Sequence, residues 1–190
     1  MISDEDLYLD GRETAMTQLI GRYERPLYRF ILQMVGDAHL AEDIFQETFL
    51  RLHNSRTQYL RGAPLKPYVY RIAMNVVRDA RRRKSSRLKK ASLDGTADGT
   101  TPLNKILPGD TPDPSSNAEH QELQHRIRKA VDGLPEIERE VVLLRVFEGL
   151  TFAQIAEITG VALPTAKSRM LYALRRLRPA LESAALNTRI

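Results

Sequence analysis

The stretch TFAQIAEITGVALPTAKSRMLYALRRLRP, residues 151–179, is the clearest indication of structure in the chain. It predicts a short helix, FAQIAEIT, that begins at a Thr151-x-x-Gln154 capping box and ends at Gly160. A long basic helix, TAKSRMLYALRRL, follows and is expected to end at Pro179. A short helix, a glycine turn and a long basic helix form a helix-turn-helix, whose second helix enters the major groove of DNA.

This segment contains one apolar and one polar set of side chains. The apolar set is expected to pack the unit: Ile155, Ala156, Val161, Ala166, Met170, Ala173, Leu174 and Leu177. The polar set is expected to face DNA: Thr165, Lys167, Ser168, Arg169 and Tyr172. A basic helical hairpin that binds protein is the alternative, but the capping box and the glycine turn at these offsets favour a DNA-binding unit.

Two more helices are predicted upstream in the second half of the chain. Ser116-x-x-Glu119 resembles a capping box at the start of the first. Pro135 is expected at the first position of the second, PEIEREVVLLRVFE, which Gly149 ends.

The first half of the chain predicts helices over Arg12–Tyr23, Pro26–Met34 and Ala38–His53, with Gly36 ending the second. In the third helix the core stripe consists of Ala41, Ile44, Phe45, Thr48, Phe49 and Leu52. The opposite face is polar and mostly acidic, and it carries Glu42, Asp43, Gln46, Glu47 and Leu50. Such a face either docks on a basic protein surface or is solvated, and the residues alone leave both open.

A basic and aromatic segment follows over Lys66–Lys84, KPYVYRIAMNVVRDARRRK. Basic side chains contact phosphates, and aromatic rings and amides stack on exposed bases or hydrogen-bond to them, so the segment suits single-stranded or locally opened nucleic acid. Packing in the core is an equal alternative for each tyrosine. The candidate contacts, including one tyrosine just before the segment, are Tyr59, Tyr68, Tyr70, Arg71, Asn75, Arg78, Arg81 and Arg82.

Composition divides the chain into two domains. Residues 85–117 are rich in Gly, Pro, Ser, Thr and Asp and lack apolar periodicity, which is typical of a flexible tether. We therefore expect an all-α fold of two small helical domains, residues 1–90 and 117–190, joined by a flexible linker over residues 91–116.

The net charge is −6 over residues 1–50, +12 over 51–93 and +5 over 161–190. This alternation indicates two surfaces that face polyanions, with solvated basic faces as the alternative.

Several classes of protein are disfavoured by the residues that the chain lacks. It has no Cys, which removes disulfides, zinc–thiolate sites and a cysteine nucleophile. No apolar run approaches the roughly 18 residues of a membrane span, and the acidic N-terminus is no secretory signal. The histidines have no metal-ligand spacing, and the glycines form no phosphate-binding loop. We expect a cytoplasmic protein with no cofactor, no metal site and no catalytic residues.

Together, the two halves resemble the bacterial extracytoplasmic-function (ECF) RNA polymerase sigma factors of the sigma-70 family, the short kind with only the second and fourth sigma regions. The stretches that carry the resemblance are VGDAHLAEDIFQETFLRLH, YRIAMNVVRDARRRK, LPEIEREVVLLRVFEGLTFAQIAEITGV and TAKSRMLYALRRL, in this order and spacing. The resemblance implies a promoter-specificity subunit of RNA polymerase that recognises the −35 duplex and the opened −10 strand and directs transcription initiation. Its implied partners are core polymerase (the β′ clamp helices and the β subunit), promoter DNA and, as in many relatives, an anti-sigma factor.

The resemblance also implies roles for single residues. Asp43, Gln46, Glu47 and Leu50 would bind the β′ clamp helices. Asn75, at the family's turn between two helices, would hold a base flipped from the opened strand, and the arginines after it would hold the backbone. Lys167, Ser168 and Arg169 match the recognition-helix positions that face the −35 element.

The chain departs from the family pattern at several positions, one of which is Tyr172, where some relatives carry a basic residue. The family often has Trp where this chain has Tyr68, and it usually has a Ser cap and a Gly where this chain has Ala162 and Pro164. The −35 base preference is therefore the least transferable implication.

Two other functions stay open on the residues alone. One is a helix-turn-helix repressor or activator whose first half senses a ligand or dimerises, which an apolar ligand pocket or a palindromic operator would favour. The other is a decoy that binds anti-sigma factors with little DNA contact, against which the density of Lys and Arg after Tyr68 argues. The promoter, the regulon and the inducing signal cannot be inferred from these residues.

Overall fold

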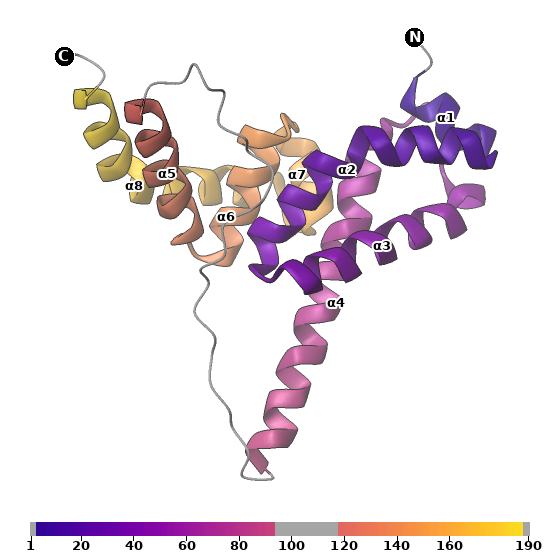
Figure 1. Cartoon of the computed structure of the whole chain (residues 1–190), viewed down its shortest axis with the longest axis horizontal. Coiled ribbons are helices and arrows are strands. Elements are labelled where there is room, and N and C mark those ends of the chain that lie inside the picture. Colours follow the sequence, from indigo (N-terminus) through magenta and orange to yellow (C-terminus); the bar gives the residue numbers. More distant parts are fainter. Residues whose placement is uncertain (1–2, 94–117, 188–190) are drawn as a thin grey trace. The chain divides into compact units, whose positions relative to one another are not determined.

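The computed structural model describes residues 3–93 and 118–187, with side chains described over 3–86 and 125–182. Within these ranges every element is helical and no strand occurs, which confirms the predicted all-α class. None of the helices in these ranges has the length and apolar character needed to cross a bilayer. The elements, shown in Figure 1, are α1 (Asp4–Asp10), α2 (Glu13–Val35), α3 (Ala38–Asn54), the 3₁₀ turn η1 (Arg56–Gln58), α4 (Leu65–Leu93), α5 (Ala118–Asp132), α6 (Glu136–Val142), the π-helical turn η2 (Leu143–Phe147), α7 (Phe152–Thr159) and α8 (Leu163–Asn187).

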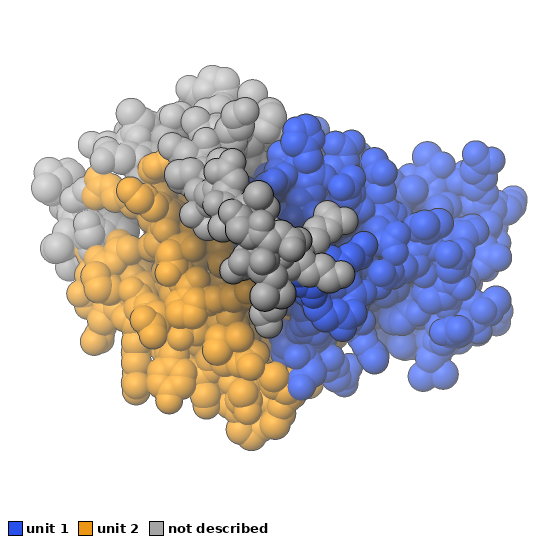
Figure 2. All heavy atoms as spheres, turned by 90° about the horizontal axis from the view of Figure 1, so that it is seen from below, with its two compact units in different colours: residues 1–102, 157–160 blue, residues 103–156, 161–190 orange. Residues whose placement is uncertain are grey.

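The chain groups into two compact units (Figure 2). One comprises residues 1–102 with 157–160, and the other comprises residues 103–156 with 161–190. The predicted linker over residues 91–116 lies outside the described residues, except for 91–93, which are the end of α4. The predicted limits of the two domains therefore stay predictions.

Helix α1 opens the first unit. Ser3 caps it in a capping box with Asp6, and Tyr8 is fully buried. The helix ends at Gly11, whose φ of 67° is a left-handed value that residues with a Cβ rarely adopt. A Cβ at Gly11 would also lie 1.3 Å from Nη1 of Arg56, so the side chain of Arg56 occupies the space that glycine leaves open.

The core of the first unit forms where the apolar faces of α2, α3 and α4 meet. Gly36 ends α2 with a φ of 70°, and Asp37 caps α3 by accepting a hydrogen bond from the N–H of Leu40 at 3.0 Å. The predicted stripe on α3 is confirmed, with Phe45 half-buried and the other five residues buried. The fully buried residues of this core include Leu19, Leu27, Ile31, Ala41, Leu52, Val69 and Met74.

The two helices predicted over Arg12–Tyr23 and Pro26–Met34 are the single helix α2, so the predicted break at Pro26 is wrong. Pro26 removes one backbone hydrogen bond inside the helix, at a cost of about 3 kcal/mol. Tyr23, Leu27 and Phe30 are all buried and lie on one face across the proline. Packing of this continuous face offsets the proline.

Helix α4 is likewise unbroken where the family resemblance implies a turn. Asn75 lies in the interior of α4 with an exposed side chain, so it is not at a junction between two helices. The helix also continues past the predicted end at Lys84 to Leu93. Residues 85–93, SSRLKKASL, include several good helix formers but no apolar period, so helix propensity extends the helix where periodicity does not predict it.

In the second unit the predicted start of the helix-turn-helix is confirmed. The N–H of Thr151 donates to Oε1 of Gln154 at 2.9 Å, and the N–H of Gln154 donates to Oγ1 of Thr151 at 3.3 Å. Gly149 and Gly160, on either side of α7, have φ values of 69° and 70°. Helices α7 and α8 with the glycine turn between them are the predicted short helix and long helix.

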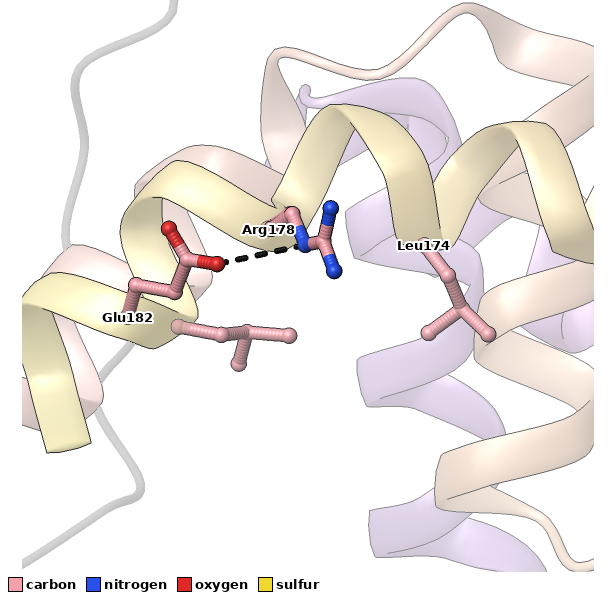
Figure 3. Close-up of a pocket in the computed structure, with 4 residues that line it drawn as sticks. Leu174, Arg178 and Glu182 are labelled. Atoms are coloured by element: carbon pink, nitrogen blue, oxygen red, sulfur yellow. Dashed lines mark ion pairs between the residues drawn. The ribbon is translucent and has the colours of Figure 1, made fainter.

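One residue predicted to pack the helix-turn-helix is on the surface instead. Leu174 is 43% exposed and, with Leu181, Arg178 and Glu182, lines a surface hollow of about 310 Å³ on α8 (Figure 3). The buried stripe of α8 consists of Ala166, Ala173 and Leu177. Leu174 follows Ala173 directly, so it is rotated by about 100° away from this stripe. Of the other predicted packing residues, Val161 and Met170 are half-buried and the rest are buried.

Two helix ends in the second unit differ from the prediction. The helix PEIEREVVLLRVFE is α6 followed by the π-helical η2, and Pro135 is its N-cap rather than its first residue. Helix α8 continues through Pro179, which is exposed, so water can satisfy the carbonyl that the proline leaves without a donor. The predicted capping box at Ser116 lies outside the described residues.

Candidate nucleic-acid interface

The predicted partner-binding face of α3 lies on the surface of the first unit. Asp43 and Gln46 are exposed, and Glu47 is half-buried. Leu50 is 56% exposed, whereas the adjacent Phe49 is buried. Carboxylates beside an exposed leucine fit a protein partner that is basic and partly apolar.

Glu47 belongs to a row of four alternating charges that joins α3 to α4, and we call these residues (Glu47, Arg51, Asp79 and Arg82) the ion-pair row. Oε1 of Glu47 accepts from Nε of Arg51 at 2.7 Å, and Nη1 of Arg51 donates to Oδ2 of Asp79 at 3.0 Å. Oδ1 of Asp79 accepts from Nη2 of Arg82 at 3.2 Å. The pKa of Arg51 is raised, mainly by its hydrogen bond with Glu47 and secondly by its hydrogen bond with Asp79. The row therefore connects the acidic face of α3 with the basic part of α4.

A groove of about 860 Å³ runs between α3 and α4 beside this row. Asp43 and Glu47 line it from α3, and Arg82, Arg83 and Lys84 line it from α4. Because charged side chains of both signs line it from both helices, the groove is unlike the apolar pocket of a small-ligand sensor.

The tyrosines predicted to contact nucleic acid have different environments. Tyr70 is fully buried, with its ring edge-on to Phe30 at 5.2 Å between centroids. Tyr59 is 8% exposed, and its hydroxyl donates to the carbonyl of Ala63. The structure corrects both predictions, because a ring enclosed in the core has no free face for a base. Tyr68 is half-buried, 5.3 Å from the ring of Tyr59, and stays a candidate contact.

The polar residues of α4 are brought together on one face. Arg71, Asn75 and Arg82 are exposed and Arg78 is half-buried, and their spacing at i, i+4, i+7 and i+11 places them on the same side of the helix. Arg81 lies outside this spacing, and its Nη2 donates to the carbonyl of Met34 at the end of α2. Arg81 thereby caps a neighbouring helix, and its predicted contact with DNA stays a prediction.

Helix α1 is absent from the predictions, yet it supports the loop ahead of α4. Oε1 of Glu5 accepts from the N–H of Gly62 at 2.6 Å. The hydroxyl of Tyr8 donates to the carbonyl of Leu52 at 2.7 Å, and burial raises the pKa of Tyr8, so the donor stays protonated. The motif Ser3-x-x-Asp6 before Leu7 is the signal in the sequence that indicates this helix.

The predicted DNA-facing residues of α8 are accessible. Ser168 donates from Oγ to the carbonyl of Pro164 at 2.9 Å, which leaves its oxygen able to accept. The guanidinium of Arg175 lies 5.9 Å from the ring centroid of Tyr172, within cation–π range. Arg169 is half-buried, and the exposed members of the set are Thr165, Lys167, Ser168 and Tyr172.

Arg145 is a further residue that the sequence patterns do not single out. Its Nη1 donates to the carbonyl of Leu150 at 2.9 Å, and its guanidinium lies 5.1 Å from the ring centroid of Phe152. It thereby ties η2 to the turn that precedes the helix-turn-helix. A lone arginine in the apolar run VVLLRVF is the signal that could have drawn attention to it.

Among the residues that the structure describes, no group of His, Cys, Asp or Glu side chains could hold a metal ion. The candidate surfaces are therefore built from protein charges, amides and aromatic rings.

Family models match both units of the chain. Sigma-70 region 2 matches residues 19–87, and Sigma-70, region 4 matches residues 124–177. The RNA polymerase sigma factor CarQ of Myxococcus xanthus is 32% identical over 171 residues, which are 90% of this chain and 91% of CarQ. The ECF RNA polymerase sigma factor SigW of Bacillus subtilis is 29% identical over 161 residues, 84% of this chain and 85% of SigW.

Solved structures share the fold. The sigma factor RpoE of Bartonella quintana, in complex with the anti-sigma factor NepR, has a TM-score of 0.70 at 22% identity and covers 87% of this chain and 96% of its own. CnrH, in complex with the cytosolic domain of CnrY, has a TM-score of 0.63 at 19% identity, over 95% and 97% of the two chains. With both sigma regions matched in order and relatives aligned along most of its length, the chain belongs to the sigma-70 family, as an ECF RNA polymerase sigma factor.

Proposed function

We propose that the chain is a promoter-specificity subunit of bacterial RNA polymerase that acts in the cytoplasm. The observation that carries the proposal is the presence on one chain of a sigma-70 region 2 with an exposed acidic face and a sigma-70 region 4 with a basic helix-turn-helix. The first provides a surface for a basic protein, and both units present cations to nucleic acid.

Core polymerase binds the face of α3. The contacts are Asp43, Gln46, Glu47 and Leu50, which share the side of α3 opposite the core. The β′ clamp helices are the partner on this face, and the β subunit is a second polymerase partner of the chain. Electrostatic attraction to the carboxylates would speed association, and Leu50 would supply apolar area.

The opened −10 strand binds along α4. Arg71, Arg78 and Arg82 neutralise backbone phosphates, while Asn75 and Tyr68 contact bases that have left the stack. Unstacking costs a few kcal/mol per base, so base contacts combined with cationic backbone contacts stabilise the open strand.

The −35 duplex binds the recognition helix α8. Its contacts are Thr165, Lys167, Ser168, Arg169 and Tyr172. Lys and Arg at these positions donate hydrogen bonds to phosphates or to the O6 and N7 acceptors of guanine. Ser and Thr hydrogen-bond to phosphate oxygens or base edges.

The chain works by binding at two places and contributes no catalytic group, since polymerase supplies the chemistry of RNA synthesis. Two tethered contacts on one promoter raise the effective concentration of the second after the first has formed. An anti-sigma factor is a predicted additional partner that would compete for these surfaces.

The test is transcription in vitro by core polymerase on a genomic promoter pool, with and without the full chain. We expect specific transcripts only with the chain, and their loss with Asp43→Arg. Glu24→Arg makes the same charge change at an exposed position of α2 and should retain the transcripts. Identical transcripts with and without the chain would overturn the proposal.

A further inference from the structure

We propose that Arg51 and Asp79 are positioning residues for polymerase binding. Asp79 on α4 anchors the guanidinium of Arg51, and Arg51 holds the Glu47 carboxylate in the orientation that meets the polymerase. The inference rests on the proposed function, in which Glu47 is a polymerase contact and Arg82 is a DNA contact.

The geometry of Arg51 supports this role. Its Nε and Nη1 donate to carboxylates on two different helices, at 2.7 Å to Glu47 and 3.0 Å to Asp79. The guanidinium is planar, so two bonds from different nitrogens fix the orientation of its plane. Glu47 is thereby oriented before a partner arrives, which reduces the side-chain entropy lost on binding.

Stability alone does not explain the ion-pair row. The side chains of Glu47, Arg51 and Asp79 are 38%, 37% and 32% exposed, and that of Arg82 is 80% exposed. Pairs this exposed contribute little to the free energy of folding. Their main effect is therefore on where the side chains point.

Asp79 has a second partner, and this gives the role a distinctive signature. Its Oδ1 accepts from Arg82 at 3.2 Å. Loss of the Asp79 charge removes the anchor of Arg51, which weakens polymerase binding through Glu47. The same change releases Arg82 and removes a negative charge beside bound phosphates, so binding of single-stranded DNA should stay equal or become tighter.

The experiment compares the full chain with Asp79→Asn in three measurements: affinity for core polymerase, affinity for a fluorescein-labelled single-stranded DNA oligonucleotide of mixed sequence, and thermal unfolding. We expect polymerase binding to weaken by about three- to tenfold, which corresponds to coupling between neighbouring side chains. DNA binding should not weaken, and Tm should change by only about a few degrees. Asp79→Glu keeps the charge and should restore polymerase binding. Asp10→Asn removes a carboxylate from another ion pair, with Arg12 at 2.6 Å, and should change neither affinity.

Adding Glu47→Gln separates the possible failures. The double variant Glu47→Gln with Asp79→Asn should bind polymerase no more weakly than Glu47→Gln alone. If Glu47→Gln weakens binding but Asp79→Asn does not, the positioning role is overturned while the proposed function stands. If Glu47→Gln has no effect, the Glu47 contact and the positioning role both fail, while Asp43→Arg still tests the rest of the polymerase face. Additive effects, or weaker binding of polymerase and DNA together, would also overturn the positioning role.

A second variant covers loss of folding in Asp79→Asn. Arg51→Lys keeps one charge but lacks the planar fork that reaches both carboxylates. It should weaken polymerase binding and leave DNA binding unchanged, and full polymerase affinity in this variant would overturn the role.

Discussion

Helices α4 and α8 both carry predicted DNA contacts, but they present them in different ways. In the α4 set, Tyr59 and Tyr70 are buried and Arg81 bonds to the carbonyl of Met34. On α8 every predicted contact is exposed or half-buried. Helix α4 packs against α1, α2 and α3 within its own unit, whereas the residues predicted to contact DNA on α8 lie outside its buried stripe.

The difference shows how packing reassigns amphipathic side chains. A helix covered by several neighbours uses aromatic rings to fill the core and long arginines to cap adjacent helices. On the exposed side of a helix, as on α8 and on the side of α4 that carries Arg71 and Asn75, the same residue types stay available to a ligand. Substituting a predicted DNA contact on α8 should therefore leave the stability of the fold unchanged. Substituting a buried member of the predicted set on α4 should also destabilise the fold.

The largest effect should come from Tyr70→Ala compared with Tyr172→Ala. Removing the buried ring of Tyr70 should lower the free energy of unfolding by about 3–5 kcal/mol, whereas Tyr172 is 52% exposed and its loss should change stability by about 0.5 kcal/mol or less. Urea titration followed by circular dichroism measures both. An unchanged midpoint for Tyr70→Ala would contradict the contrast between the helices.

This contrast marks how far the sequence predicts the site. The α8 residues were predictable because a capping box, a glycine turn and a short apolar stripe define which side of the helix is free. On α4 the apolar stripe includes Tyr70, which precedes the buried Ala73 and Val77 by three and seven residues, so the helical period favours the core alternative for this ring.

Contacts between elements distant in sequence are a second feature that the sequence does not predict. The bond from Arg81 to Met34, the support of Gly62 by Glu5 and the bond from Arg51 to Asp79 each join separate helices or loops. Local periodicity does not report such contacts. Helix class, the cap at Thr151 and the glycine turns are local in origin and were predicted.

Within α4, Asn75→Ala tests a predicted DNA contact that is exposed although it lies in the middle of the helix. Promoter opening should fall about tenfold, since one lost base contact costs about 1–3 kcal/mol, while binding to closed duplex stays unchanged. Permanganate reactivity of the −10 region measures opening. Gln18→Ala, an exposed amide on α2, is the matched control. Equal loss of duplex binding and opening would count against a base contact.

On α8, Lys167→Ala should weaken binding to a −35 duplex by about threefold and reduce the slope of log K against log salt by up to about 0.9, the contribution of one phosphate. Lys129→Ala removes an exposed lysine from α5 and should leave the slope unchanged. A salt slope that does not respond to Lys167→Ala would show that this side chain contacts no phosphate.

The smallest effects should be pH-dependent and opposite in sign in the two units. The hydrogen bond from Arg12 lowers the pKa of Asp10 below its usual 3.8, so this carboxylate contributes stability above 3.8 that is lost as pH falls through the folded pKa. Burial raises the pKa of Asp132 above its usual 3.8, because it favours the protonated carboxyl in the folded protein. The stability that this carboxyl contributes is therefore complete below pH 3.8 and is lost as pH rises through the folded pKa.

Asp10→Asn should therefore lower Tm slightly at neutral pH, and Asp132→Asn should raise it slightly. Both differences in Tm should become smaller in acid. The difference for Asp10→Asn should disappear below the folded pKa of Asp10, and that for Asp132→Asn below pH 3.8. Thermal unfolding of both variants at neutral and acid pH provides the check. Shifts of the same sign in the two variants would refute the assignment.

Gly11 has a consequence for how freely this protein can be diversified. A left-handed backbone costs other residues roughly 1–2 kcal/mol, and here the guanidinium of Arg56 would also have to be displaced. Libraries that randomise the exterior should therefore be depleted of variants at this position, with Asn as the best-tolerated replacement. Positions outside the core can therefore tolerate few substitutions where the backbone must adopt a left-handed conformation.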